Sequence, residues 1–268
     1  MEVFQVPALQ SEVNRLNIQV LDMAYAKLDK RWRNGGFYTT FTRIYMVRSG
    51  SAMIRCEGQD VSLLPGNIYI IPAGVLFEFW CEDEMEKFFY HINVPRYNQY
   101  DIFAGCKKCI ILHNRAKEIE KTVAYCQENT VSAAIALKEQ LYRLVLQAIR
   151  TGGIEAGDIE NYSSPIKAAV AYIHSDLSAN LTIEAIAQRV DLSPLSLQKR
   201  FRQEIGIPLR RYINDQLMMA AEQALWRKNA SVNQISEQLG FCDQFYFSRR
   251  FKQYFGISPT AYRKRIFT

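Results

Sequence analysis

Histidine is scarce in this sequence, with three copies in 268 residues. His91, His113 and His174 stand far apart, whereas a zinc site draws its imidazole ligands from a compact set. The chain also lacks a Ser/His/Asp set, a phosphate-binding loop and a carboxylate pair in a catalytic setting. We therefore expect no catalytic residues, no metal and no cofactor, and the sequence argues against an enzyme.

Long apolar runs are missing as well. No stretch approaches the ~20 apolar residues that span a bilayer. The N-terminal segment MEVFQVPALQSEVNRLN has no basic region followed by an apolar core, so it does not resemble a secretory signal. The six cysteines are scattered, as free thiols of a reducing compartment would be. These features predict a cytoplasmic protein without a membrane partner.

One cysteine pair has a spacing that deserves a separate interpretation. Cys106 and Cys109 enclose two lysines, and His113 follows closely. A single pair supplies two ligands, whereas a structural zinc needs four. We expect two free thiols here, with a minor hypothesis that the neighbouring lysines lower their pKa and make them sensitive to oxidation.

Acidic residues are few in the last third of the chain. From Pro165 to the end, 15 Lys and Arg stand against 8 Asp and Glu, a net charge of +7, while the whole chain carries +6. In the segment Gly240–Arg265, six cations and eight Phe or Tyr accompany a single acid, Asp243. This asymmetry favours a polyanionic partner, either nucleic acid or an anionic membrane. The alternative is that the excess of Lys and Arg only keeps the protein soluble, and net charge alone does not exclude this.

The texture of the chain changes twice. From about 37 to 95, short aromatic and β-branched runs between Gly and Pro turns predict a β sandwich or barrel. From about 115 to 150 the spacing becomes helical, and the glycine-containing, acidic segment 151–163 is typical of a linker. The helical segment carries an apolar stripe that could be internal core or a dimer seam: Leu137, Leu141, Leu144, Val145 and Ala148.

After the linker every segment is predicted to be helical. Ser-Pro pairs beginning at Ser164, Ser193 and Ser258 mark three helix starts, because serine caps free amides and proline costs no hydrogen bond at the next position. Ser231 with Gln234 gives a fourth start, a capping box. The fold class is therefore α+β, with an N-terminal β barrel followed by helices.

The helical region contains an internal repeat. Ile186, Val190 and Leu192 align with Ile235, Leu239 and Phe241 at a shift of 49 residues. At a shift of 50 residues, Leu197, Phe201, Gly206, Ile207 and Tyr212 align with Phe247, Phe251, Gly256, Ile257 and Tyr262, so the second copy has one extra residue in its turn. Each copy has the outline of a helix-turn-helix unit. In the second helix of each copy, periodicity turns Leu197 and Phe201, or Phe247 and Phe251, inward.

The opposite faces of these second helices suit the reading of bases. Each offers a long cation, a hydroxyl or amide, and an apolar tip, which match guanine, adenine and the thymine methyl group. A merely solvated face is the alternative, but it would not favour Leu195 and Phe245 at equivalent positions. Between the copies, residues 209–228 contain no helix breaker and predict a rod of roughly 30 Å. Successive major grooves lie ~34 Å apart, so one rod could hold both helices in adjacent grooves.

These residues resemble the DNA-binding region of the AraC/XylS family of bacterial transcription regulators, over about 164–265. The similarity is dense in GFCDQFYFSRRFKQYFGISPTAYRKR, from Gly240. The resemblance implies base contacts in two successive grooves from Leu195, Ser196, Gln198 and Lys199, and from Gln244, Phe245, Ser248 and Arg249. We expect phosphate contacts from Arg202, Arg250, Lys252 and Arg263.

The N-terminal region resembles the family more weakly. In GNIYIIPAGVLF, the spacing of Gly66, Pro72 and Gly74 is similar to the second cupin motif, with Phe77 where a metal-binding cupin places histidine. The resemblance implies a jelly-roll effector domain with an apolar, aromatic pocket for a sugar or another uncharged organic ligand. Candidate lining residues are Arg33, Phe77, Phe79 and Tyr90, although each could be plain barrel core.

The expected organisation is an effector-binding domain at 1–112, a helical dimerisation segment at 113–150, a linker at 151–163 and a tandem helix-turn-helix domain at 164–268. The expected partners are double-stranded DNA, a small-molecule effector such as a sugar, a second copy through residues 115–150 and, for an activator, RNA polymerase. The alternative is a cupin-type enzyme or sugar-binding module with an accessory DNA-binding tail. Basic helices bound to a membrane or to RNA are a third hypothesis.

Overall fold

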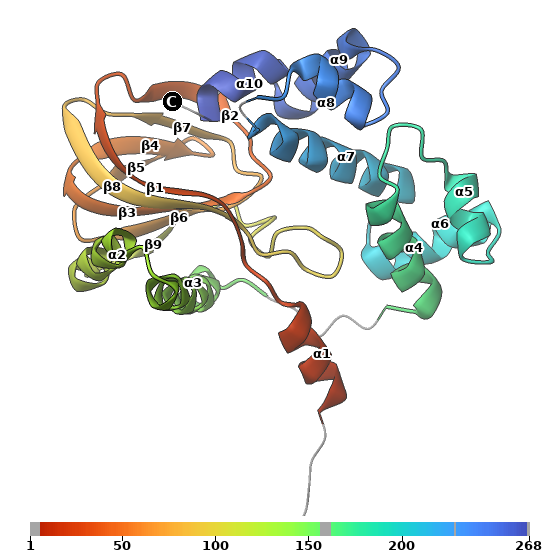
Figure 1. Ribbon diagram of the computed structural model, residues 1–268, viewed down its shortest axis with the longest axis horizontal. Coiled ribbons are helices and arrows are strands. Elements are labelled where there is room, and N and C mark those ends of the chain that lie inside the picture. Colours follow the sequence, from red (N-terminus) through yellow and green to blue (C-terminus); the bar gives the residue numbers. More distant parts are fainter. Residues whose placement is uncertain (1–5, 156–161, 228, 267–268) are drawn as a thin grey trace, which may run out of the picture. The chain divides into compact units, whose positions relative to one another are not determined.

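The computed structural model describes residues 6–155, 162–227 and 229–266 (Figure 1). The chain divides into two compact units, Met1–Ile159 and Glu160–Thr268. Of the linker expected at 151–163, residues 156–161 lie outside the described residues, and its first two residues belong to a helix that ends at Gly152. No helix in the described part of the chain is long and apolar enough to cross a bilayer.

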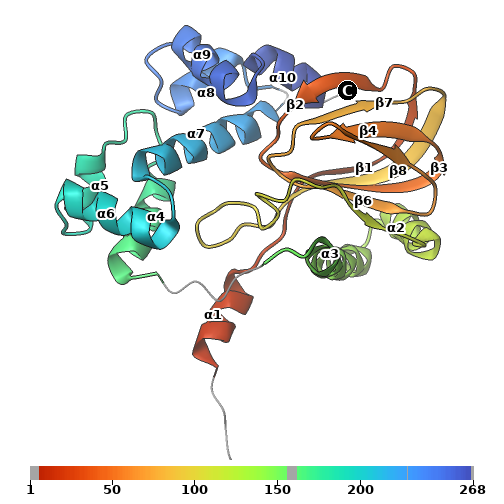
Figure 2. The ribbon, with the colours of Figure 1, turned by 180° about the vertical axis from the view of Figure 1, so that it is seen from behind.

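The first unit consists of two antiparallel sheets that face each other, as the β-rich sequence predicts (Figure 1, Figure 2). The five-stranded sheet has the order β1 (Gln19–Asp29), β8 (Glu84–Asn93), β3 (Thr42–Gly50), β6 (Ile68–Ile71), β9 (Ile110–Leu112). The four-stranded sheet has the order β2 (Arg33–Phe37), β7 (Phe77–Trp80), β4 (Ala52–Cys56), β5 (Gln59–Leu63). A short helix, α1 (Pro7–Arg15), precedes the sheets and buries none of its residues.

The central strands of the five-stranded sheet, β8, β3 and β6, are buried on both faces. Side chains alternate along a strand, so cross-strand partners share a face. Ile44 of β3 pairs with Tyr90 of β8, and both belong to a core that includes residues of the following helices. The next pair along, Tyr45 with Phe89, points to the other side, toward the four-stranded sheet. Strands with two buried faces carry few polar positions, which explains the nearly continuous apolar runs in this region.

Two helices cover the outer face of this sheet. α2 (Ala116–Glu128) and α3 (Val131–Gly152) lie beneath β3, β6 and β9 (Figure 1). Four residues of the predicted α3 stripe join the core against the sheet: Leu141, Leu144, Val145 and Ala148. Of the two alternatives for this stripe, the structure shows internal core, so the dimer seam that the family resemblance favours is wrong for these four residues, because the sheet already covers them.

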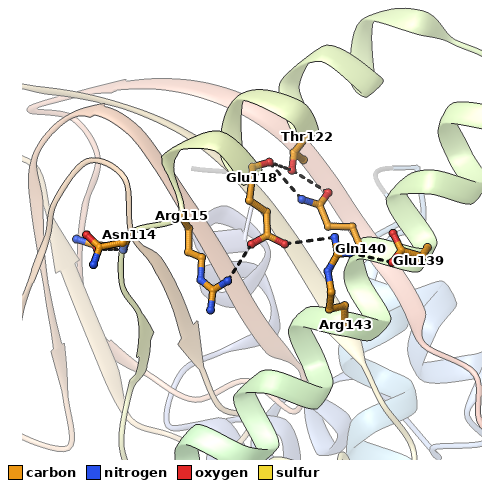
Figure 3. Close-up of polar contacts among 8 residues, drawn as sticks. Asn114, Arg115, Glu118, Thr122, Glu139, Gln140 and Arg143 are labelled. Atoms are coloured by element: carbon orange, nitrogen blue, oxygen red, sulfur yellow. Dashed lines mark hydrogen bonds and ion pairs between the residues drawn. The ribbon is translucent and has the colours of Figure 1, made fainter.

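A polar network fixes α2 against α3 (Figure 3). The buried Thr122 hydroxyl donates to Gln140 Oε1 at 2.9 Å, and Gln140 Nε2 donates to the Glu118 carbonyl oxygen at 3.2 Å. The Glu118 carboxylate lies 3.6 Å from Arg115 and 3.7 Å from Arg143. Because buried polar groups are costly unless they are paired, this network specifies one packing of the two helices.

The second unit is entirely helical in its described residues. Its helices are α4 (Ser164–Ser175), α5 (Ile183–Arg189), α6 (Pro194–Ile205), α7 (Leu209–Leu225), α8 (Val232–Gln238), α9 (Gln244–Phe255) and α10 (Pro259–Ile266). The helices α4 to α6 gather at one end of α7, and α8 to α10 gather at the other (Figure 1, Figure 2). The turn between α5 and α6 is one residue shorter than the turn between α8 and α9, as the two repeat spacings predict.

The predicted helix starts are confirmed with one change of detail. Ser193 caps α6 by accepting from the Ser196 amide, and Ser231 with Gln234 forms a complete capping box on α8. At α4, however, the N-cap is Ser163, and it does not cap the helix through its side chain. Its amide and hydroxyl instead donate to the Glu204 carboxylate at 2.7 and 2.8 Å.

The central helix α7 is shorter than the sequence predicts. It ends at Leu225, with Trp226 as its C-cap, rather than continuing to residue 228. Its 17 residues give a rod of about 25 Å instead of roughly 30 Å. The predicted length rested on the absence of a helix breaker through residue 228, which permits a helix but does not require one.

Candidate nucleic-acid interface

The first helix-turn-helix unit presents α6 to solvent along one face. Leu197 and Phe201 are fully buried, as predicted, and they hold the helix against α4, α5 and α7. Asp191, with φ of +53°, reverses the chain before α6. The five residues predicted on the opposite face are all exposed: Leu195, Ser196, Gln198, Lys199 and Arg202.

Two polar side chains on this face are already oriented by their neighbours. The Ser193 hydroxyl donates to Ser196 Oγ at 2.8 Å, and Gln198 Nε2 donates to the Pro194 carbonyl oxygen at 3.3 Å. Leu195 is 78% exposed, although it is apolar. The face therefore combines ordered hydrogen-bonding groups, a cation and an unburied apolar tip.

The second unit repeats this arrangement on α9. Phe247 and Phe251 are fully buried, and Phe245, equivalent to Leu195, is 77% exposed. Arg249 and Lys252 are exposed, whereas Gln244 and Ser248 are half-buried. Asp243 caps α9 through a 2.7 Å bond from the Tyr246 amide, which lowers the pKa of its carboxyl. The single acid of this basic segment thus has a structural position at the start of the helix.

Five of the eight aromatic residues of the segment are buried and form the core of the second unit: Phe241, Phe247, Phe251, Phe255 and Tyr262. Phe251 lies at the centre, with ring centroids 4.4 Å from Phe255, 5.4 Å from Tyr262 and 5.8 Å from Phe247. The Tyr262 hydroxyl donates to Glu222 of α7, and both residues are fully buried. The abundance of Phe and Tyr near the chain end is therefore a packing requirement.

The expected phosphate-binding residues fall into two groups. Arg202 and Lys252 are exposed on the recognition helices. Arg250 is half-buried and donates to Asn214 of α7 and, at 2.9 Å, to the Tyr246 hydroxyl. Arg263 is half-buried, and its Nε and Nη2 atoms are buried without a hydrogen-bond partner among the described residues. Arg250 thus contributes to the contact between α7 and α9.

Two connections hold the helix-turn-helix units together. One is α7, which contacts α6 as well as α8 and α9. The other joins the loop after α4 to the second turn, where the Ala179 amide donates to the Leu239 carbonyl oxygen at 2.8 Å. Gly240, with φ of +72°, makes this approach possible, because a Cβ there would lie 3.2 Å from Ser178 Cβ. A closed connection of this kind makes the second unit one body.

The predicted effector-binding residues do not form one site. Phe77 and Phe79 lie buried between the sheets, where Phe79 stacks on Trp32 at 4.3 Å. Arg33 is exposed on β2. Tyr90 is buried on the outer face of the five-stranded sheet, in the core shared with α2 and α3. The strand face of Tyr90 is therefore opposite to the one that faces Phe77 and Phe79.

The sequence interpretation missed the cations of the barrel interior. Arg43 and Lys87 are each 3% exposed, and both lie on the inner face of the five-stranded sheet with His91. The pKa of Lys87 falls well below its usual value because of burial and, next, because of the Arg43 charge. The sequence could have indicated this, because alternation along the strand KFFYHINV puts Lys87, Phe89 and His91 on one face.

Cys109 does not behave as the minor hypothesis expects. Cys109 shares a hydrogen bond with the Cys56 thiol, and this contact together with burial raises its pKa well above the usual range. A raised pKa disfavours the reactive thiolate, so the neighbouring lysines do not activate Cys109. Within the described residues, no three or more His, Cys, Asp or Glu side chains are grouped as metal ligands.

Comparisons with known proteins agree with this geometry. A family model described as a helix-turn-helix domain matches residues 186–265, which contain both units. The chain is 24% identical to the Msm operon regulatory protein of Streptococcus mutans, over 95% of each chain. It is also 24% identical to the lactose operon transcription activator of Staphylococcus xylosus, over 84% of this chain and 85% of the relative.

A likeness to a solved structure extends over both units. The structure of ToxT from Vibrio cholerae matches with a TM-score of 0.58 and 13% identity, over 92% of this chain and 98% of that one. At this identity the likeness shows the fold. The order of an antiparallel β domain followed by paired helix-turn-helix units is thus found in a protein of nearly the same extent.

Proposed function

The chain belongs to the AraC/XylS family of transcription regulators, and from this premise we propose how its two units act. It is a sequence-specific DNA-binding regulator. One observation carries the proposal for DNA recognition. The equivalent positions Leu195 and Phe245 are 78% and 77% exposed on two helices that are otherwise packed by buried aromatic and aliphatic residues. A solvated surface does not select the same exposed apolar position twice, whereas contact with thymine methyl groups does.

Each recognition helix reads one box of the target duplex. Leu195, Ser196, Gln198 and Lys199 contact bases in one major groove, and Gln244, Phe245, Ser248 and Arg249 contact bases in the next. Lys199 and Arg249 bond guanine edges, and the apolar tips meet thymine methyl groups. Arg202, Lys252 and Arg263 neutralise phosphates, and Arg250 positions α9 through Asn214.

The first unit binds the effector and a second copy of the chain. One relative is named for the lactose operon, which supports a small organic effector for this chain as well. The homodimer forms through the outward face of α3, where Val131, Ile135 and Leu146 remain exposed after the inward stripe has packed on the sheet. As an activator in the cytoplasm, the dimer would also contact RNA polymerase.

The test is selection of bound sites from random duplexes, followed by two reciprocal variants. Two short boxes about one helical turn apart should emerge, with a salt dependence that indicates roughly six or more phosphate contacts. Arg249→Ala should relax base preference in one box, and Lys199→Ala in the other, each by about 1–3 kcal/mol. Each variant is the control for the other.

Outcomes that contradict this assignment are equally clear. An equal loss of affinity for all sequences in both variants would make Lys199 and Arg249 phosphate contacts. Binding without any preference for duplex sequence would instead favour RNA or an anionic membrane. Stoichiometric iron, manganese or zinc in the purified protein would revive the cupin-type enzyme.

A further inference from the structure

A cavity of about 940 Å³ lies in the first unit, on the outer face of the five-stranded sheet. The first residues of β1 form one wall, and the end of α2 with the start of α3 forms the other. β1 is an edge strand of this sheet, and its outward side chains Val20 and Met23 are 45% and 46% exposed. The volume is within the range of roughly 300–1,000 Å³ that holds small organic molecules.

A β-bulge shapes the strand wall of the cavity. The register of β1 with β8 shifts between Val20 and Asp22, which makes Leu21 the bulged position. Beyond the bulge, Met23 pairs directly with Tyr90 of β8, whose side chain belongs to the core on the outer face of the sheet. Bulges redirect side chains and are common at sheet edges beside functional sites. This one places a half-exposed methionine next to a buried tyrosine.

The inner wall of the cavity contains a buried hydroxyl group that makes no hydrogen bond. Tyr90 is 1% exposed, and its Oη atom has no hydrogen-bond partner among the described residues. Burial, and next the Cys126 thiol of α2, raises the pKa of Tyr90, so the hydroxyl keeps its proton at neutral pH. Cys126 also lines the cavity, which places the hydroxyl on its side of the sheet. Because an unpaired buried donor is unfavourable, a ligand atom that accepts this hydrogen bond would be stabilised.

The charges of the lining favour a ligand without net charge. Asp22 and Lys138 are its two charged residues, one of each sign. Lys138 is exposed and donates to Asn17 Oδ1 at 3.4 Å. A carboxylate beside Tyr90 would therefore be buried without a cation next to it, which is costly. The buried part of the lining is largely aliphatic and suits an apolar ligand: Ile18, Leu137 and Leu141.

We propose that this cavity binds the effector, an uncharged and mainly apolar organic molecule whose carbonyl or ether oxygen accepts a hydrogen bond from Tyr90. The effector would then lie on the outer face of the sheet, outside the barrel interior that the sequence implies, and this assignment rests on the proposed regulator function. The flexible Met23 side chain, directly opposite Tyr90, would move aside to admit the ligand oxygen.

Nile red is a suitable probe, because it is uncharged, aromatic and carries a ring carbonyl. We would titrate it into the full chain and follow its fluorescence, which increases when the dye enters an apolar site. Ala134→Trp fills the cavity from the wall formed by α3 and should weaken binding at least tenfold. Ala124→Trp is the matched control, because Ala124 is also exposed but does not line the cavity. It should change the affinity less than twofold.

The role of the hydroxyl is tested by Tyr90→Phe. Nile red emits at shorter wavelength when its carbonyl accepts no hydrogen bond, so the emission of the bound dye should shift in that direction. Affinity should fall by about fivefold, the loss expected for one hydrogen bond. The variant removes an unpaired buried group, so the unfolding temperature of the dye-free chain should stay the same or rise. A lower unfolding temperature with unchanged emission would show that the hydroxyl has only a structural role and would contradict the proposal.

Other outcomes overturn the site as a whole. These are a failure of Nile red to bind, or equal binding by Ala134→Trp and the unaltered chain. A dye affinity that falls as protein concentration rises would also overturn it, because a second copy would then occupy the cavity. The regulator function is measured separately, by the sequence preference of the unaltered chain for the selected duplex. If that preference is present and the dye results fail, the effector site alone is wrong, whereas its absence would refute the regulator function itself.

Discussion

Two large apolar side chains of the second unit, those of Leu195 and Phe245, stand almost entirely in solvent. Scattered apolar residues are normal on protein surfaces, but these two occupy the same position in both copies of a repeat. Their neighbours Leu197 and Phe247, two residues further along the same helices, are fully buried. On both helices, therefore, one apolar side chain faces solvent and the apolar side chain two residues further along faces the core.

Truncation of the exposed side chains should therefore weaken DNA binding without affecting stability. Leu195→Ala and Phe245→Ala should change the free energy of unfolding by less than about 0.5 kcal/mol, because neither side chain is packed. Each should reduce affinity for the selected duplex and relax preference at one base position. The matched control is Leu197→Ala, which should cost about 2–5 kcal/mol of stability through a core cavity. Urea denaturation and duplex titration of the three variants check this. A large loss of stability in Leu195→Ala would contradict it.

At the scale of elements, the two helix-turn-helix units are equivalent in outline and differ in their turns. The second turn contains Gly240, whose backbone approaches the loop after α4. Gly206 ends α6 with φ of +88° and has no heavy atom within 4 Å of a Cβ built there. Both glycines have a left-handed backbone, so only the close approach distinguishes them.

A pair of alanine substitutions isolates that approach. Gly206→Ala should cost about 1–2 kcal/mol, the strain of an L residue in the left-handed region. Gly240→Ala should cost more, because its Cβ would also press on Ser178 and Asn180. The excess should appear in the unfolding transition of the second unit and in weaker binding to two-box duplexes. An equal loss of unfolding free energy in the two variants would contradict this, because it would show that the loop after α4 moves away from the added Cβ at no cost.

Sequence patterns predicted the second unit better than the first for a physical reason. When a helix buries one face, the apolar positions in its sequence identify that face. The inward side chains predicted in this way, Leu197, Phe201, Phe247 and Phe251, are all fully buried. The five-stranded sheet has two buried faces, so alternation groups Lys87 with His91 without showing that they face the other sheet. For the same reason the apolar stripe of α3 did not reveal whether a sheet or a second copy covers it.

At the scale of the whole molecule, the second unit is expected to hold its two recognition helices at a fixed separation. Its two recognition helices are held by α7 and by the bond from Ala179 to Leu239. A body closed at two places does not extend to follow its target. The spacing of the two boxes is therefore expected to be as strongly selected as their sequences.

Altered spacing between the boxes tests this rigidity. Insertion of 5 base pairs should abolish two-box binding, because the second box then faces the opposite side of the duplex. Insertion of 10 base pairs restores the side but adds ~34 Å, which a rigid body cannot bridge, so a single chain should not recover affinity either. Competition titrations with the three duplexes check both expectations. Full affinity for the 10-base-pair insertion would show that the units move apart.

The shortness of α7 leads us to expect that the bound duplex is bent. A rod of about 25 Å is shorter than the ~34 Å between successive grooves of a straight duplex. Curvature toward the protein brings the inward-facing grooves closer together, and its elastic cost depends on the base steps that lie between the boxes. Flexible pyrimidine–purine steps in that uncontacted spacer should thus be favoured, although no side chain touches them.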